Sequence, residues 1–271
     1  ISTLLMLVVI TMTGRAEKKS RHKPIAALII VLITGSLLIY GTLDMPYFGA
    51  ADAPIHNHVA PRYINDSMQE IGVPNIVTSV LASYRAFDTF GEVVVIFTAG
   101  IGVLSLLFVA RRPEDDEQLA AINDSMHEQH LVVRIVAKIL IPFIFLFALY
   151  VQFHGDFGPG GGFQAGVILA AAVILYALIF GLEAAKEAFP PSWVRIGMTL
   201  GVLLYGGTGV VTWILGADFL SYGVLAEKSY HGQHYGIIAV ELGVLFAVTS
   251  VMIAIFYAFG SRQPDQDGED W

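Results

Sequence analysis

The sequence predicts an all-α membrane protein: a polytopic bundle of about six full transmembrane helices, a partial N-terminal helix and an interfacial amphipathic helix. Of the 271 residues, 55% are hydrophobic and only 14% are charged, whereas soluble globular chains carry about a quarter charged residues. Several apolar runs have the roughly 20 residues that a helix needs to cross about 30 Å of hydrocarbon. Charged residues gather between these runs, which favours a membrane protein over an unusually apolar soluble one.

The same composition excludes several other classes. A disordered chain is poor in apolar residues and rich in charge. The absence of cysteine excludes disulfides, cysteine metal sites and cysteine nucleophiles. Lys and Arg number 15 against 23 Asp and Glu, so a basic surface for nucleic acid is not expected.

Six stretches have the length and composition of a full span. They are residues 24–43, 93–110, 131–151, 164–182, 193–215 and 235–259. Residues 1–12 form a seventh apolar run, which is too short to cross alone. A signal peptide has its basic residues before its apolar region, but here they follow it. We therefore interpret this run as the distal end of a helix whose beginning is missing or supplied by another polypeptide; a surface helix or processed segment is the alternative.

Two further elements are expected between the first two spans. Residues 44–70 contain three prolines and are predicted to be irregular. Residues 75–90 carry apolar side chains on one helical side and polar ones on the other, which predicts an amphipathic helix in the membrane interface. On its polar side, Arg85 and Asp88 stand three residues apart and are expected to pair. Such a pair is either a surface contact of small value or a part of an ion path.

Lys and Arg gather on one side of the predicted membrane, which the positive-inside rule assigns to the cytoplasm. Alternation of the spans places these residues there: Arg15, Lys18, Lys19, Arg21, Lys23, Arg111, Arg112, Lys186 and Arg262. The opposite side keeps only Arg62, Arg85 and Lys228. We therefore expect a multi-pass protein of the plasma membrane with a cytoplasmic C-terminus. The net charge of −8 then belongs chiefly to solvated cytoplasmic acids.

A long charged stretch predicts a division into two membrane modules. Residues 113–129 form an acidic cytoplasmic linker between a first module, residues 1–112, and a four-helix module, residues 130–260. Residues 261–271 form a polar, acidic cytoplasmic tail.

A glycine-rich loop, residues 151–163, reads VQFHGDFGPGGGF. Non-helical backbone at the end of a span must line protein or water, and glycine lets backbones approach closely. The loop residues of interest are Gly158, Pro159, Gly160, Gly161 and Gly162. No Lys-Ser/Thr follows them, so a phosphate-binding loop is not expected. Two stripes of small residues favour close helix packing: Gly166, Ala170, Ala177 and Gly181, and Gly243, Ala247, Ser250 and Ala254.

Three charged residues lie within or beside the predicted spans. Glu241 stands inside the last span, where a carboxylate is costly unless it is paired, hydrated or protonated, so it is a candidate for ion translocation. Lys138 either extends its ammonium to the cytoplasmic surface or pairs with a buried acid. Glu92 opens the second span, where the helix macrodipole alone would favour it.

No catalytic centre and no cofactor site are apparent. His56 with His58, and His231 with His234, have the spacing of surface metal sites but lack a further ligand in register, so no metal is expected. His154 beside the glycine loop is able to titrate near neutral pH, although packing within the loop is the simpler role.

Longer motifs resemble known families. Residues 130–166, HLVVRIVAKILIPFIFLFALYVQFHGDFGPGGGFQAG, and residues 234–260, HYGIIAVELGVLFAVTSVMIAIFYAFG, resemble the B-type component (MnhB/MrpB) of the Mrp-type multisubunit sodium/proton antiporter. Residues 83–92, SYRAFDTFGE, with the preceding PNIVTSVL, resemble the E-type module of membrane-bound hydrogenases. That module also forms the C-terminal end of the antiporter's large MrpA component, and residues 1–13 resemble the last helix of the module before it.

This resemblance implies a non-catalytic membrane subunit of an electrogenic Na⁺/H⁺ exchanger related to the membrane arm of respiratory complex I. It implies the A, C, D, E, F and G components of the Mrp antiporter as partners, and Na⁺ and H⁺ as transported ions. It makes Glu92 the acid most important for transport. The other ion-translocation candidates have no assigned step: Glu241, Lys138, Asp88, Arg85 and His154. Two alternatives stay open, a purely structural subunit and a subunit of a membrane-bound hydrogenase or complex I-like assembly.

Overall fold

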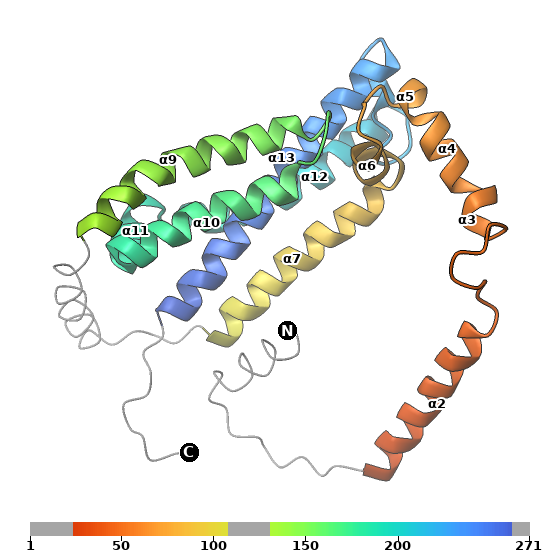
Figure 1. Ribbon diagram of the computed structural model, residues 1–271, viewed down its shortest axis with the longest axis horizontal. Helices are drawn as coiled ribbons and strands as arrows, with labels where there is room; N and C mark the ends of the chain where they lie inside the picture. Colours follow the sequence, from red (N-terminus) through yellow and green to blue (C-terminus); the bar gives the residue numbers. More distant parts are fainter. Residues whose placement is uncertain (1–23, 108–130, 262–271) are drawn as a thin grey trace. The chain divides into compact units, whose positions relative to one another are not determined.

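The computed structural model describes residues 24–107 and 131–261, and every regular element in these ranges is a helix (Figure 1). Six of the described helices are long and apolar enough to cross a membrane. The prediction of an all-α polytopic membrane bundle is thereby confirmed. Three expectations lie outside the described residues. They concern residues 1–12, the linker 113–129 and the tail 261–271, of which only the first residue is described. The chain divides into two compact units, Ile1–Arg62 and Tyr63–Trp271, and each is described by itself.

The first unit contributes one membrane-length helix, α2 (Pro24–Thr42). Its 19 residues rise about 29 Å, which is enough to cross the hydrocarbon of a bilayer. Large apolar side chains are exposed all around it, with Leu38 at 68% and Tyr40 at 75% among them. A helix that is apolar on all sides needs a cover of lipid or protein.

The segment after α2 is irregular over residues 44–53, as predicted, but three short helices follow, so the prediction of an irregular loop was wrong for residues 54–70. They are α3 (Pro54–Asn57), α4 (Val59–Asn65) and α5 (Ser67–Glu70). Prolines interrupt helix interiors, but a proline in the first turn loses no intrahelical hydrogen bond. Pro54 begins α3 and Pro61 is the third residue of α4, so neither prevents its helix.

Residues 75–90, predicted as one amphipathic helix, are divided among three elements. They are α6 (Ile76–Thr78), the π-helix η1 (Ser79–Tyr84) and the start of α7 (Ala86–Leu107). The Arg85 N–H donates to Val80 O, five residues earlier, at 2.7 Å. Arg85 itself leaves helical geometry, with φ −120° and ψ 31°. The expected single interfacial helix is therefore replaced by a break, and the next span begins seven residues before the predicted position 93.

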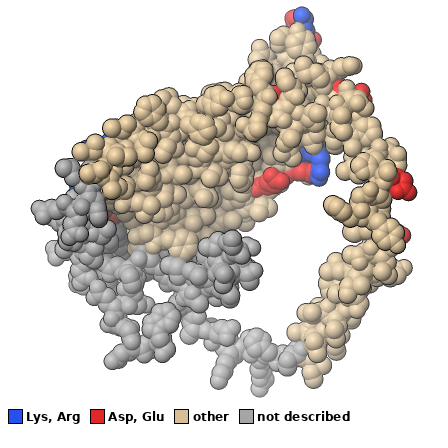
Figure 2. Space-filling view, viewed as in Figure 1, with Lys and Arg blue, Asp and Glu red and all other residues tan. Residues whose placement is uncertain are grey.

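The second unit is a bundle built around α13 (Ser229–Gly260). Besides α5, α6, η1 and α7, this unit contains α9 (Leu131–His154), α10 (Gly162–Phe180), α11 (Leu182–Ala188), α12 (Pro191–Ile214) and the 3-10 helix η2 (Tyr222–Leu225). α13 packs against α7, α10 and α12. In the apolar 18-residue stretch of α13, 67% of the residues are buried, whereas the share is 33% or less in the other candidate spans. The predicted spans are confirmed, although α7 and α13 begin seven and six residues before the predicted positions 93 and 235. Figure 2 shows most of the bundle surface in this view without charge, apart from small clusters of acidic and basic side chains at its edges. A surface covered by lipid or protein requires such a scarcity of charge.

Glycines bring α10 and α12 close to α13. A Cβ on Gly201 of α12 would lie 2.5 Å from Ala247 N, and one on Gly166 of α10 would lie 2.9 Å from Val248 Cβ. The backbones of α10 and α12 therefore pack directly against α13 at these glycines. Small residues allow such close approach between membrane helices. The predicted stripe on α10 needs one correction, because Gly181 is the C-cap of that helix with φ +97°. Glycine adopts this conformation without strain, so Gly181 ends the helix rather than packing along it.

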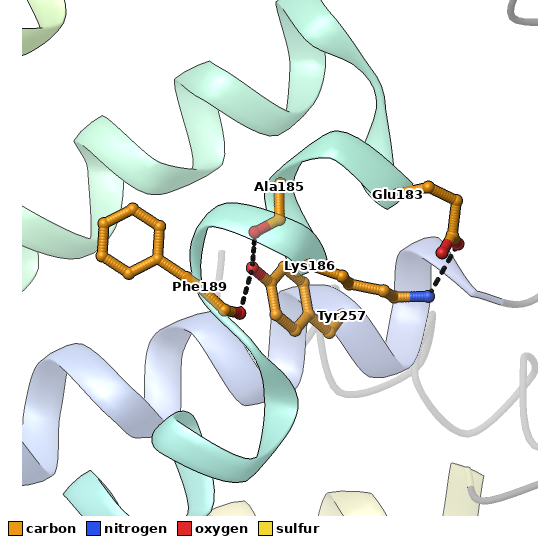
Figure 3. A network of polar contacts seen from close by, with 5 residues as sticks. All are labelled: Glu183, Ala185, Lys186, Phe189 and Tyr257. Carbon is orange, nitrogen blue, oxygen red and sulfur yellow. Dashed lines mark hydrogen bonds and ion pairs between the residues drawn. The ribbon is translucent and has the colours of Figure 1, made fainter.

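One hydroxyl fastens the last turns of α13 to the short helix α11 (Figure 3). Tyr257 Oη lies 3.0 Å from Ala185 O and 3.1 Å from Phe189 O, and it donates its proton to these two carbonyls. Lys186 pairs with Glu183 of the same short helix at 3.0 Å. The two Tyr257 hydrogen bonds hold the connection between α10 and α12 against α13, whereas the Lys186–Glu183 pair is internal to α11.

Candidate functional site

A cavity of about 760 Å³ lies at the end of the bundle where α7 and α13 begin. It is lined by α6, η1, the first turns of α7, the glycine loop, α13 and Tyr205 of α12. Two carboxylates line it, Glu92 from α7 and Glu241 from α13. The five loop residues from Gly158 to Gly162 line it as well. The tertiary structure therefore brings two of the candidate acids and the glycine loop into one place.

The glycine loop closes tightly on the end of α9. The Gly161 N–H donates to Val151 O at 3.0 Å, and a Cβ on Gly160 would lie 2.4 Å from the same carbonyl oxygen. Gly161 has φ +108°, a conformation that side chains other than glycine rarely adopt. These contacts require glycine at both positions.

Glu241 lies against the bare backbone of this loop. Cβ atoms on Gly161 and Gly155 would lie 3.1 and 3.3 Å from Glu241 Oε1, and one on Gly162 would lie 2.1 Å from Glu241 O. Glu241 is half-buried, and among the described residues no hydrogen bond or ion pair holds its carboxylate. A carboxylate in such a position is stabilised by water, a proton or a cation.

Glu92 lies in the second turn of α7 rather than at the start of the span, where the sequence places it. Six residues from Ala86 onward precede it, so it stands about 9 Å along the helix axis. The first turn holds Asp88 instead. Since the macrodipole acts within the first turn, it does not by itself account for Glu92. The side chain of Glu92 is exposed in this chain and lines the cavity.

Asn75 ties the segment before α7 to the glycine loop. Its side-chain amide donates to Gly155 O and to Gly158 O, each at 2.8 Å, and its backbone N–H donates to Asp156 O at 3.0 Å. Thr78 Oγ1 donates to Gly155 O at 2.7 Å. Segments about 80 residues apart thus form one wall of the cavity. Sequence analysis missed this role of Asn75. Its position in the sequence indicates only a helix N-cap, a role that its Oδ1 also fills for α6.

Glu241 also lines a second cavity, with a volume of about 190 Å³. The other polar residues of this cavity are Gln152 of α9, Asp156 of the glycine loop and His234 of α13. His234 Nδ1 lies 2.9 Å from Asp156 Oδ2. Burial raises the pKa of the Asp156 carboxyl above its ordinary value, and the neighbouring His234 acts in the opposite direction. Sequence analysis missed Gln152 and Asp156, since no local spacing links the end of α9 to the start of α13.

The remaining candidates lie outside both cavities. Arg85 and Asp88 form the expected pair at 2.5 Å, with side chains 60% and 51% exposed, where such a pair contributes little. The Lys138 ammonium lies 5.7 Å from the centre of the Phe180 ring. His154 stacks on the tyrosine one turn earlier in α9, with ring centres 5.0 Å apart. In residues 24–107 and 131–261, no group of three or more His, Asp or Glu residues is placed to hold a metal ion.

Two family profiles match the chain. One, described as a domain related to the MnhB subunit of Na⁺/H⁺ antiporter, matches residues 132–254. The other, MbhE, described as the E-type component of MBH, matches residues 28–123. The large cavity is built from both parts, because Glu241 belongs to the first match and Glu92 to the second.

Curated relatives cover the same two parts. A putative antiporter subunit mnhB2 of Staphylococcus aureus (strain Newman) is 36% identical over 133 residues, which cover 48% of this chain and 94% of the relative. A probable K⁺/H⁺ antiporter A/B component of Rhizobium meliloti (strain 1021) is 27% identical over 231 residues, which cover 77% of this chain. The chain spans only 23% of the length of that second relative.

Two solved complexes contain a chain of similar fold. The structure of the membrane-bound sulfane sulfur reductase, an archaeal respiratory membrane complex, matches with 26% identity and a TM-score of 0.60, covering 88% of this chain and 98% of the other. The Mrp complex from Dietzia sp. DQ12-45-1b matches in fold, with 23% identity and a TM-score of 0.60, covering 97% of this chain and 29% of the other. The chain therefore belongs to the MnhB family of antiporter subunits, and on the same polypeptide its residues 28–123 match the MbhE profile.

Proposed function

We propose that the chain is a non-catalytic membrane subunit of a multisubunit cation/proton antiporter, and that the 760 Å³ cavity is part of its ion path. The observation that carries this proposal is the meeting of Glu92 and Glu241 in one cavity. The two acids come from the two family modules and stand on two membrane-length helices. Acids inside a membrane protein are costly and mark functional positions.

The lining of the cavity suits an ion. An ion crosses hydrocarbon only where protein or water replaces its hydration shell. Glu92 and Glu241 supply carboxylates, and the cavity has room for many waters at about 30 Å³ each. Because Glu241 has no fixed partner among the described residues, it is free to exchange a proton for a cation. We infer that ions pass between the two carboxylates through this cavity.

We infer the partners and the direction from further features. The K⁺/H⁺ antiporter named for one relative and the Na⁺/H⁺ antiporter named in the MnhB profile support a monovalent cation, Na⁺ or K⁺, exchanged for H⁺. We propose the other Mrp components, A and C to G, as partners, and the likeness in fold to a chain of the Mrp complex supports such an assembly. The exposed apolar surface of α2 supports a neighbouring subunit beside it. The positive-inside rule supports a plasma-membrane protein with its C-terminus in the cytoplasm and its glycine loop on the outer side.

A structural subunit of a related respiratory membrane complex is a second candidate. The likeness to a chain of the sulfane sulfur reductase complex, 98% of which is covered, favours it. This chain has no cysteine to ligate an iron–sulfur cluster, so its role there would be structural or ion-conducting. Purification of the native complex and identification of every subunit separates the two candidates: antiporter subunits support the first, and redox subunits support the second.

The transport role is tested by Glu92→Gln and Glu241→Gln in the assembled complex. Each variant is expected to lower Na⁺- or K⁺-dependent ΔpH in everted vesicles at least tenfold, with the complex intact on a native gel. Glu187→Gln is the matched control, because Glu187 is an exposed acid on α11 and lines neither cavity. Normal exchange by both cavity variants in an intact complex would remove the cavity from the ion path. Loss of assembly instead would favour a purely structural subunit.

A further inference from the structure

The small cavity beside Glu241 contains a buried oxygen without a partner. Gln152 is only 2% exposed, and its Oε1 has no hydrogen-bond donor among the described residues. A buried polar atom of this kind is costly and calls for an unseen water, proton donor or ion. The cavity that Gln152 lines measures about 190 Å³, which is room for a small ion with several waters.

Oxygen atoms approach this cavity from three elements. Gln152 comes from the last turns of α9, Asp156 from the glycine loop and Glu241 from α13. On α13 the lining residues His234, Ile238 and Glu241 are spaced by four and then three positions, so they share one face of the helix. Two phenylalanines and Ile238 complete the lining. A few oxygens are therefore held in a small and otherwise apolar space.

We propose that this small cavity is a binding site for a partly dehydrated monovalent alkali cation, ligated by Gln152 Oε1 and by the carboxylates of Asp156 and Glu241. Amide and carboxylate oxygens replace the water shell of such ions in membrane proteins. The inference rests on the proposed function, and it places a cation-binding site on the ion path before the large cavity. Glu241 lines both cavities, so one carboxylate passes the ion from the first to the second.

The charges around the cavity favour a monovalent ion. His234 Nδ1 is 2.9 Å from Asp156 Oδ2, so the imidazole occupies one oxygen of this carboxylate, and Glu241 is the second carboxylate of the lining. Divalent ions prefer several carboxylates, and the described residues hold no group of three or more His, Asp or Glu placed for a metal. The His234 side chain is 46% exposed and that of Asp156 only 10%. The imidazole is therefore the more solvent-accessible member of this pair.

Direct binding of ²²Na⁺, and of ⁸⁶Rb⁺ in place of K⁺, to the purified complex tests the site. Gln152→Leu removes the amide oxygen and is expected to weaken binding at least tenfold, whereas Gln152→Glu keeps an oxygen at this position and is expected to retain binding. Gln69→Leu is the matched control, because Gln69 is exposed on α5 and lines neither cavity. Unchanged affinity in Gln152→Leu would show that the cavity holds only water and would overturn the proposal.

A second measurement covers the case in which Gln152→Leu fails to assemble. The chain has no cysteine, so Ile238→Cys places a single thiol of this chain in the lining of the small cavity. We expect NaCl to slow modification of this thiol by methyl methanethiosulfonate at least threefold relative to choline chloride at equal ionic strength, read by mass spectrometry of the chain. Equal rates in the two salts would contradict a cation in the cavity.

The failure of this site is distinguishable from the failure of the proposed function. If Glu92→Gln abolishes exchange while Gln152→Leu binds ²²Na⁺ normally, the proposed ion path is supported and the small binding site is refuted. If Gln152→Leu loses ²²Na⁺ binding while Glu92→Gln exchanges normally, the small site is supported and Glu92 is not part of the ion path.

Discussion

Replacement of Gly162 by alanine tests whether the cavity wall depends on backbone contact between α10 and α13. The Cβ of Gly162→Ala would lie 2.1 Å from Glu241 O and 2.9 Å from Val244 Cβ. Ordinary contact begins near 3.4 Å, so the helices must separate by roughly 1.3 Å, the difference between 3.4 and 2.1 Å. Overpacking of this kind costs about 1–3 kcal/mol, which matches or exceeds the gain of about 1 kcal/mol for alanine over glycine in a helix. We expect a net loss of stability and a displaced Glu241.

The assay combines thermal unfolding of the purified complex with cation-dependent ΔpH in everted vesicles. Gly162→Ala is expected to lower both the Tm and the exchange rate, although it removes no charge. Gly102→Ala is the matched control, because Gly102 lies in α7 and nothing lies within 4 Å of a Cβ there. That control is expected to leave both quantities unchanged or to raise the Tm slightly. A wild-type Tm with wild-type exchange in Gly162→Ala would refute the reasoning.

Three further predictions concern contacts around the two cavities and at α11. Asn75→Ala removes both amide bonds to the glycine loop and should destabilise the protein by about 1–3 kcal/mol, with faster hydrogen exchange of the loop by mass spectrometry; unchanged protection contradicts this. Tyr257→Phe removes only the hydroxyl bonded to α11, so the unfolding free energy should fall by about 1 kcal/mol while exchange stays normal. His234→Gln removes the group that lowers the pKa of Asp156, while burial still raises it. The protonated Asp156 carboxyl should then persist to higher pH than in the wild type. Infrared spectra detect this carboxyl, and its absence from Asp156→Asn assigns the band. An equal or lower titration point in His234→Gln would contradict the pairing.

The number of long helices and their approximate positions followed from hydropathy. A run of about 20 apolar residues has few stable alternatives to a membrane helix, because each backbone N–H and C=O must be paired within the segment. α9, α10 and α12 accordingly lie within a few residues of the predicted spans. Hydropathy did not reveal the start of α7, since the break at Arg85 is made by a π-helix whose residues keep an apparently regular amphipathic pattern.

The sequence by itself determined that the chain is a helical membrane protein, and that Glu92, Glu241 and the glycine loop are unusual within it. These are local properties: composition, run length and the cost of a charge in hydrocarbon decide them. Only the tertiary structure decided that the two acids share one cavity, that Asn75 joins the loop to the segment before α7, and that Gln152 lies buried beside the paired Asp156. Such placements depend on how close one backbone comes to another, and this distance is set by the packing of helices far apart in the sequence.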